Sequence, residues 1–158
     1  MRAGKHYVTF VIGGADMPFA QVGIIRPLKN WDKKGLECFD PKGRDHFDEL
    51  QQERTERWGD SKVQVCSVSG FNILQINDWD GSYATQHSWE GQHQQFVSGD
   101  RIGMLLNLDS GTLTVYKNSV RIGTISTVRL SGEYCWYGAI TIPGPDIRIE
   151  KGSTIPTD

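Results

Sequence analysis

Hydrophobic and polar residues alternate along three short runs within residues 99–125. Alternation at every second position places the apolar side chains on one face of a β-strand. Two turn signals separate the runs, Asp109-Ser110-Gly111 and Asn118-Ser119, and these residue types suit tight reversals of the chain. The pattern therefore predicts three consecutive antiparallel strands. Their apolar positions include Ile102, Met104, Leu106, Leu108, Leu113, Val115, Val120 and Ile122.

The same alternation recurs along most of the remaining chain. It predicts strands over residues 4–12, 19–26, 62–68, 71–77, 130–142 and 146–150. Residues 62–68 and 71–77 are expected to form a hairpin across Ser69-Gly70. Gly23 lies inside a predicted strand, where glycine weakens pairing unless another backbone or a large ring packs close to it. Many short strands with apolar and polar positions in alternation predict an all-β fold, an antiparallel β-sandwich of two sheets.

Residues 45–58 break this pattern, because they contain neither the strand alternation nor glycine. We predict a short helix here, with Asp45 as its N-cap and Gly59 at its end. Acidic residues fall in its first turn and basic residues in its last turn, which suits the helix dipole. The helix belongs to an insertion over 36–61 that either lies on the edge of the sandwich or is partly mobile.

Length and composition fit one soluble domain over residues 1–150, followed by an exposed tail over 151–158. The chain has 158 residues, of which 37% are hydrophobic and 23% charged. A domain of this length buries roughly 70% of the surface of its unfolded chain, so it needs no disulfide or metal to fold. The formal net charge is −2, and without a basic surplus we expect no nucleic-acid partner.

Cysteines and hydropathy indicate where the protein works. Cys38, Cys66 and Cys135 contain no CxxC pair, so a structural zinc site is not expected. Cys66 and Cys135 lie in strand-like runs, where cysteine acts as a small buried hydrophobic residue. We see no signal peptide and no membrane-spanning segment. We therefore expect an intracellular, cytoplasmic location and no membrane insertion.

Catalytic chemistry finds little support. Residues 78–93 supply acid and base types, namely Asp78, Asp80, His87, Glu90 and His93. A glycosidase would need two carboxylates facing each other across a cleft, which spacing alone does not establish. The six-residue spacing of His87 and His93 is not a tight metal pattern. No motif with a known mechanism occurs. We therefore predict no enzyme activity, no cofactor and no metal.

The residues of 99–125 resemble the signature of the SPRY family. That signature comprises a Gly-Asp, an Ile-Gly strand, a Leu-Asp-x-Gly-Thr turn and an aromatic-x-Asn hairpin. Here these are Gly99-Asp100, Ile102-Gly103, Leu108–Thr112 and Tyr116-Lys117-Asn118. Similar opening elements are Gly4-Lys5-His6-Tyr7 and Val22-Gly23-Ile24. The resemblance covers residues 4–150 and is weakest over 36–61. One departure is Ser119, where the family usually has glycine; a type I′ turn would force positive φ on that serine.

The resemblance implies a non-enzymatic protein–protein interaction module, acting as an adaptor or scaffold subunit. Such a domain binds a short peptide or a protein surface through loops on one side of the sandwich. The loop after the Val-Gly-Ile strand corresponds to Leu28, Lys29, Asn30 and Trp31. The aromatic segment before the Gly-Asp strand supplies Tyr83, Gln86, His87 and Trp89, and the loop before the last strand supplies Ile142, Pro143 and Gly144.

Alternatives stay open at this point. Trp31 either folds back onto the sheet or serves as an interface anchor. We expect Trp31 and Trp89 to contribute to partner binding more than to stability. Exposed tryptophan and tyrosine also stack on sugars, so a carbohydrate-binding sandwich is one alternative. A structural subunit of a larger assembly is another.

Overall fold

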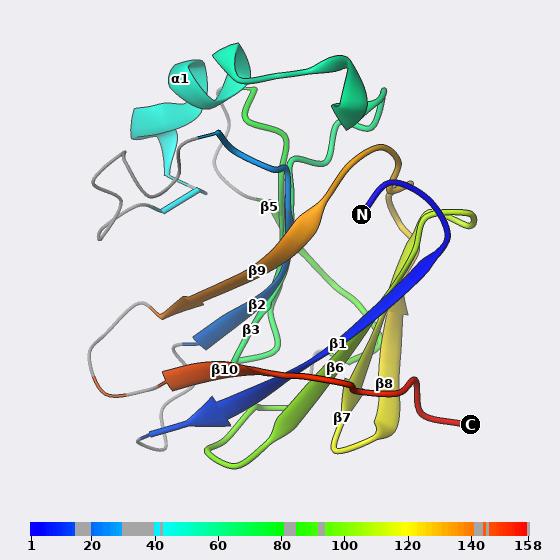
Figure 1. Cartoon of the computed structure of the whole chain (residues 1–158). Coiled ribbons are helices and arrows are strands. Elements are labelled where there is room, and N and C mark those ends of the chain that lie inside the picture. The colour runs from blue at the N-terminus through cyan, green and yellow to red at the C-terminus, as the bar shows by residue number, and fades with distance from the viewer. Residues whose placement is uncertain are drawn as a thin grey trace.

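The computed structural model describes residues 1–14, 20–29, 40–41, 43–80, 85–91, 94–140, 144 and 146–157. Two antiparallel five-stranded sheets face each other in this part of the chain, which confirms the predicted all-β sandwich (Figure 1). The first sheet has the order β10-β1-β6-β7-β8. The second has the order β5-β4-β3-β2-β9.

The strands of the first sheet are β1 (Lys5–Gly13), β6 (Arg101–Asn107), β7 (Thr112–Lys117), β8 (Val120–Ile125) and β10 (Asp146–Glu150). Those of the second sheet are β2 (Ala20–Ile25), β3 (Val65–Ser69), β4 (Leu74–Asn77), β5 (Thr85–His87) and β9 (Cys135–Ile140). The meander β6-β7-β8 agrees with the prediction for 99–125, except that Leu108 lies in the turn after β6. Strand β1 pairs with both β6 and β10, so the start of the chain lies beside its end.

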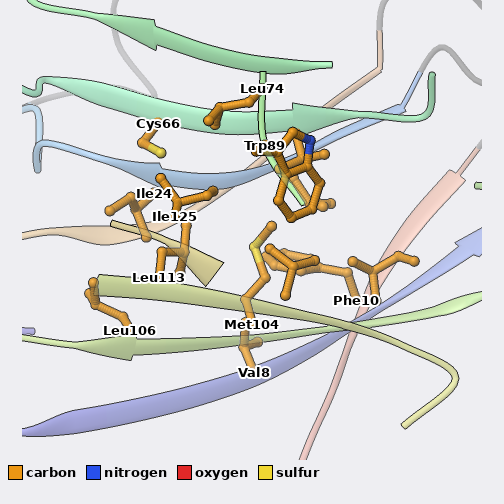
Figure 2. Close-up of a cluster of buried hydrophobic side chains, with 14 of the residues drawn as sticks. Val8, Phe10, Ile24, Cys66, Leu74, Trp89, Met104, Leu106, Leu113 and Ile125 are labelled. Atoms are coloured by element: carbon orange, nitrogen blue, oxygen red, sulfur yellow. The ribbon is translucent and has the colours of Figure 1, made fainter. Parts of the chain in front are cut away.

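The main hydrophobic core fills the space between the sheets. Alternate residues of β1, namely Val8, Phe10 and Ile12, point inward and are at most 5% exposed. They meet Ile24 and Cys66 of the opposite sheet in one continuous cluster (Figure 2). Cys66 is fully buried, as expected, and burial raises the pKa of its thiol to about 12. No helix in the described part of the chain is long and apolar enough to cross a membrane.

Trp89 belongs to this core, which argues against the expectation that it contributes to partner binding more than to stability. The side chain is 8% exposed and its Nε1 donates a hydrogen bond to the carbonyl of Asn72 at 2.8 Å. Next to it, the Glu90 carboxylate accepts hydrogen bonds from Arg121 and from the Thr124 amide of β8. Residues 89–91 therefore close the side of the sandwich between β5 and β8.

Two turns show how local backbone geometry shapes the sheets. Asn118 and Ser119 have φ of 51° and 69°, the left-handed pair that a type I′ hairpin requires. The hairpin between β3 and β4 differs from the prediction, because residues 70–73 form a longer turn. Asn72 adopts φ of 59° there, so Phe71 and Asn72 are not strand residues.

Gly23 was expected to have another backbone or a large ring packed close to it, because it lies inside a strand. A Cβ at this position would collide with the carbonyl oxygen of Cys66 on the neighbouring strand β3. Strands β2 and β3 approach too closely here for a side chain. This confirms that another backbone packs against Gly23.

The insertion contains a shorter helix than predicted. Helix α1 spans Phe47–Gln52, between 3-10 turns at Arg44–His46 (η3) and Glu56–Trp58 (η4). Asp45 is not its cap: it lies in η3, and the N-cap His46 makes no side-chain capping bond. The single helix over 45–58 fails because Thr55 adopts an extended conformation, with φ −123° and ψ 161°.

A second hydrophobic cluster holds this insertion in place. Phe47, Leu50 and Trp58 are buried against residues of β2, β3 and β9 and against Trp79. The strand residues, Ile25, Val65 and Tyr137, alternate with core positions and so lie on the outer face of the second sheet. Thus residues of 44–58 pack on that outer face near the end of β2, and Figure 1 shows α1 at one end of the second sheet, above β2 and β9.

Arg26 is the largest exception to the apolar interior. It directly follows β2 and is 0% exposed. Its Nε donates to Gln64 Oε1 at 3.0 Å, and its two Nη atoms donate to the carbonyls of Ser61, Ser131 and Glu133 at 2.9–3.1 Å. None of these four acceptors is charged. Burial therefore lowers the pKa of the guanidinium to about 10.

An aromatic ring completes the Arg26 site. The guanidinium carbon lies 3.9 Å from the centre of the Tyr134 ring, a cation–π contact. The Tyr134 hydroxyl donates to the carbonyl of Val63 at 2.9 Å, and its backbone pairs with Met1. Arg26 thereby joins the end of β2 to residues 61–64 and 131–134 and, through Tyr134, to the N-terminus.

Replacing Ser119 with glycine is expected to stabilise the domain by about 0.5–1 kcal/mol, because glycine adopts positive φ without the Cβ penalty. Chemical denaturation measures the change. Ser126→Gly is the control, since Ser126 is exposed and has no positive φ. Equal effects of the two substitutions would contradict the assignment of strain to Ser119.

Trp89→Ala is expected to destabilise the domain by about 3–5 kcal/mol, because it empties a large site in the core. Thermal unfolding followed by near-UV circular dichroism measures the loss. Gln86→Ala on the exposed strand β5 is the control. A melting temperature unchanged by Trp89→Ala would show that the ring does not fill the core.

Arg26→Met is expected to cost at least about 3 kcal/mol of unfolding free energy, because it leaves four buried acceptors without donors. Arg26→Lys is expected to restore only part of the loss, since an ammonium cannot reproduce the planar fork. Arg129→Met, at an exposed arginine, serves as the control. Stability equal to wild type in Arg26→Met would refute the role given to this site.

Candidate binding site

A groove lies beside the end of β2, next to the 3-10 turn η4 of the insertion. Its volume is about 450 Å³. The lining comes from three segments: the residues after β2, the turn η4 with the residue before it, and the segment before β9. The lining residues are Pro27, Leu28, Lys29, Thr55, Arg57, Trp58 and Glu133.

Hydrogen bonds fix these three segments relative to one another. The amide of Lys29 donates to Glu53 Oε2 at 2.7 Å, which ties the chain after β2 to the end of α1. The amide of Glu133 donates to the carbonyl of Arg57 at 2.7 Å. The Arg26 guanidinium donates a hydrogen bond to the carbonyl of the same Glu133 at 3.0 Å. The groove is therefore a rigid feature built on the Arg26 site.

The groove combines an apolar floor with charged walls. Trp58 is 1% exposed and packs in the second hydrophobic cluster, against which Leu28 also lies. The exposed residues Lys29 and Arg57 supply positive charge, and Glu133 forms an ion pair with Arg2 at 3.1 Å. The Nε1 of Trp58 is buried and has no hydrogen-bond acceptor in the described structure. Such a lining offers contact area for an apolar side chain and donors for backbone or polar groups.

A second hollow of about 510 Å³ is lined by residues of α1 and by residues of 62–64 and 78–80. Gln51 crosses its base and donates to the carbonyls of Asp78 and Trp79 at 3.1 and 3.0 Å. The Asp78 carboxylate accepts from the Asp80 amide at 3.0 Å, so these two acids form a local turn. Among the described residues no group of three metal-ligating side chains comes together.

The structure places the predicted site residues in different parts of the second sheet. Leu28 and Lys29 line the groove at the end of β2. Gln86 and His87 lie on β5, the outermost strand at one edge, whereas Gly144 follows β9, the outermost strand at the other. Three strands separate β5 from β9, which places them roughly 19 Å apart. The described members therefore do not form one cluster. Asn30, Trp31, Tyr83, Ile142 and Pro143 lie outside the described residues.

Sequence reasoning missed much of the groove. Thr55, Arg57 and Trp58 were expected in a continuous helix, and Glu133 in a strand. Arg26 lay at the end of a predicted strand and belonged to no recognised motif, so nothing in the sequence singled it out. The signal that could have found the floor is Trp58 itself, a large apolar residue directly before Gly59 that would share one helical face with Phe47 and Leu50.

Comparisons with known proteins bear on the fold. No protein-family model and no curated protein matches the sequence. Among solved structures, the SPRY domain of human HERC1 matches with 14% identity and a TM-score of 0.57, over 98% of this chain and 79% of that one. The TRIM65 PSpry domain matches with 18% identity and a TM-score of 0.52, over 94% of this chain and 64% of that one.

A human SPRY domain also matches, with 14% identity and a TM-score of 0.50, over 94% of this chain and 77% of that one. Identities this low support a shared fold and no shared ligand. The three neighbours are SPRY domains, the family whose signature residues 99–125 resemble. The chain is therefore a SPRY-like β-sandwich domain.

Proposed function

We propose that this domain is a non-enzymatic binding module that holds a short peptide or a protein surface, as an adaptor or scaffold subunit inside the cell. The SPRY-like fold supports the general class. The groove beside Leu28 and Lys29 is the observation that carries the proposal, because it lies at a loop that the sequence resemblance had already selected. A rigid β-scaffold that presents a preformed groove suits binding with little loss of entropy.

The groove supplies the contacts from which the binding mode follows. Leu28, which packs against the cluster that contains the buried Trp58, contacts one apolar side chain of the partner. Lys29 and Arg57 at the rim hydrogen-bond to polar groups or carbonyls beside it. An apolar residue that a partner buries inside a ring of polar and charged residues is the arrangement in which interface hot spots are found.

The other predicted loop residues extend this proposal without adding support to it. Asn30 and Trp31 continue the chain from Lys29 and would lengthen the contact surface. Tyr83, Gln86 and His87, and likewise Ile142, Pro143 and Gly144, form separate contact regions of a larger partner. Trp89 contributes only by holding residues 89–91 in the core.

The alternative of a sugar-binding surface draws no support from the described tryptophans. Three of the four described tryptophans, Trp58, Trp79 and Trp89, are each 8% exposed or less. The fourth, Trp136, is partly buried and packs against the main core, with its ring centre 6.4 Å from that of Phe10. Sugar stacking requires an open aromatic face, whereas these four rings pack in or against the two cores. We therefore favour a protein or peptide partner.

The first experiment identifies the partner and then tests the groove. Affinity purification from the native source, with mass spectrometry, supplies candidates whose affinity is measured by calorimetry with purified components. Leu28→Asp is expected to weaken binding at least about tenfold, because it places a carboxylate on the apolar floor. Lys29→Ala is expected to weaken it less.

Each variant has a matched control on the other sheet. Val120→Asp makes the same kind of change at a residue that is 66% exposed on β8, and Lys5→Ala removes an exposed lysine from β1. Thermal unfolding of all four variants separates binding from stability. Affinities that fall equally in Leu28→Asp and Val120→Asp would refute the groove as the binding site.

A further inference from the structure

The two sides of the sandwich differ in how they are closed. Between β5 and β8, residues 89–91 cover the gap and Trp89 inserts into the core. On the opposite side, β9 and β10 are the outermost strands of their sheets. There the inward-facing side chains stay open to solvent: Ile140 is 43% exposed and Ile149 is 59% exposed.

The pairing register shows that these isoleucines face the interior. Ile149 lies directly opposite Phe10, and Ile147 opposite Ile12, and both partners on β1 are core residues. Directly opposed residues in antiparallel strands point to the same face. Ile147 reaches Gly138 of β9, where a Cβ would meet it at 3.6 Å. Ile149 lies further along β10 and has no comparable cover. The apolar layer thus continues past β1 and ends uncovered.

An edge strand with an exposed apolar face normally carries charges that prevent pairing with another chain. The outward positions of β10 are charged, but their signs alternate: Asp146, Arg148 and Glu150. A mixed pattern repels a second copy only in some registers. In other registers the same pattern attracts a second copy. The charges therefore favour some pairing registers and disfavour others.

Three antiparallel registers of β10 against a second β10 can be compared. Centred on Arg148, the pairing sets Arg148 against Arg148 and Asp146 against Glu150, so every charged pair is repulsive. Centred on Ile147, it sets Ile147 against Ile147 and each Asp146 against the other copy's Arg148, but Ile149 then opposes Pro145, which has no amide to donate. Centred on Ile149, it sets Ile149 against Ile149 and each Arg148 against the other copy's Glu150. Both isoleucine-centred registers have an apolar centre and two opposite-charge pairs, and of these two only the Ile149-centred register avoids Pro145.

Neighbouring contacts suit the same register. The Glu150 carboxylate already forms an ion pair with Arg101 of β6 at 2.6 Å. Arg148 of the other copy would extend this pair into a network across the two copies. Arg148 lies 3.5 Å from Asp146 and is highly exposed, so its present ion pair is weak and easily exchanged.

From these observations we propose that the chain forms a two-fold homodimer by antiparallel pairing of β10, centred on Ile149. The two first sheets then join into one continuous sheet, and the open side of each sandwich is covered by the other copy. Because a single short strand pair buries a small area, the dimer is weak and concentration-dependent. The surface shares no residue with the groove at Leu28, so this inference is independent of the binding proposal.

The first test measures mass against concentration by analytical ultracentrifugation of the wild-type chain. We expect a rise from monomer toward dimer as the protein reaches high micromolar concentration. Ile149→Lys is expected to remove the rise, because two lysines then oppose each other at the centre. Val120→Lys on β8, the outermost strand at the other edge of the same sheet, is the control and is expected to keep it.

A second test reads the register directly. With Cys38 and Cys135 replaced by serine, Ile149→Cys is expected to give a disulfide-linked dimer on mild oxidation, because directly opposed Cα atoms lie about 4.5–5.5 Å apart. Arg148→Cys is the control. Its counterpart in the other copy is displaced by two residues and lies about 7–8 Å away or further, beyond disulfide reach.

Each outcome decides the proposal. A wild-type chain that stays monomeric over the whole range overturns it, as does a dimer that survives Ile149→Lys. Equal cross-linking of Ile149→Cys and Arg148→Cys overturns the register. A dimer lost in Val120→Lys but kept in Ile149→Lys assigns the contact to β8 instead. Thermal unfolding confirms that each variant is folded.

Discussion

The Arg26 guanidinium is the contact on which the groove end of this domain depends. A buried charge without a carboxylate partner is costly, and here four oriented oxygens and the Tyr134 ring compensate for its lost hydration. These acceptors come from segments far apart in the sequence, at residues 61–64 and 131–133. The same contact therefore neutralises the cost of burial and fixes three loops relative to one another. Removing it would loosen all of them together.

Two hydrophobic cores stabilise different parts of the fold. The main core holds the sheets face to face, and the second core attaches residues 44–58 to the outer face of the second sheet. The groove lies where this second core meets the Arg26 site, so its floor is as rigid as a protein interior. Loops presented on such a support can vary in sequence without altering the scaffold, which is the property a recognition module needs.

One side of the sandwich is covered by other residues of the chain, and the other side is open to solvent. Residues 89–91 seal one side by inserting a tryptophan and holding Glu90 against β8. The other side ends in β10, whose apolar face is exposed and whose charges alternate in sign. Antiparallel sheets tolerate one solvated face, but an uncovered inward face is a cost that another chain can relieve.

The sequence by itself determined the strands, the sandwich and the family resemblance, because two-residue alternation and turn residues act locally. It also set two conditions that the structure meets, namely positive φ at Ser119 if the turn is type I′ and a backbone or a ring packed close to Gly23. Tertiary structure alone decided that Trp89 fills the core, that helix α1 ends at Gln52, and that Arg26 is buried. Each of these depends on partners remote in sequence: Asn72 for Trp89, the outer face of the second sheet for α1, and the carbonyls of 61 and 131–133 for Arg26. Local pattern carries no information about such partners, since burial is set by what the rest of the chain places nearby.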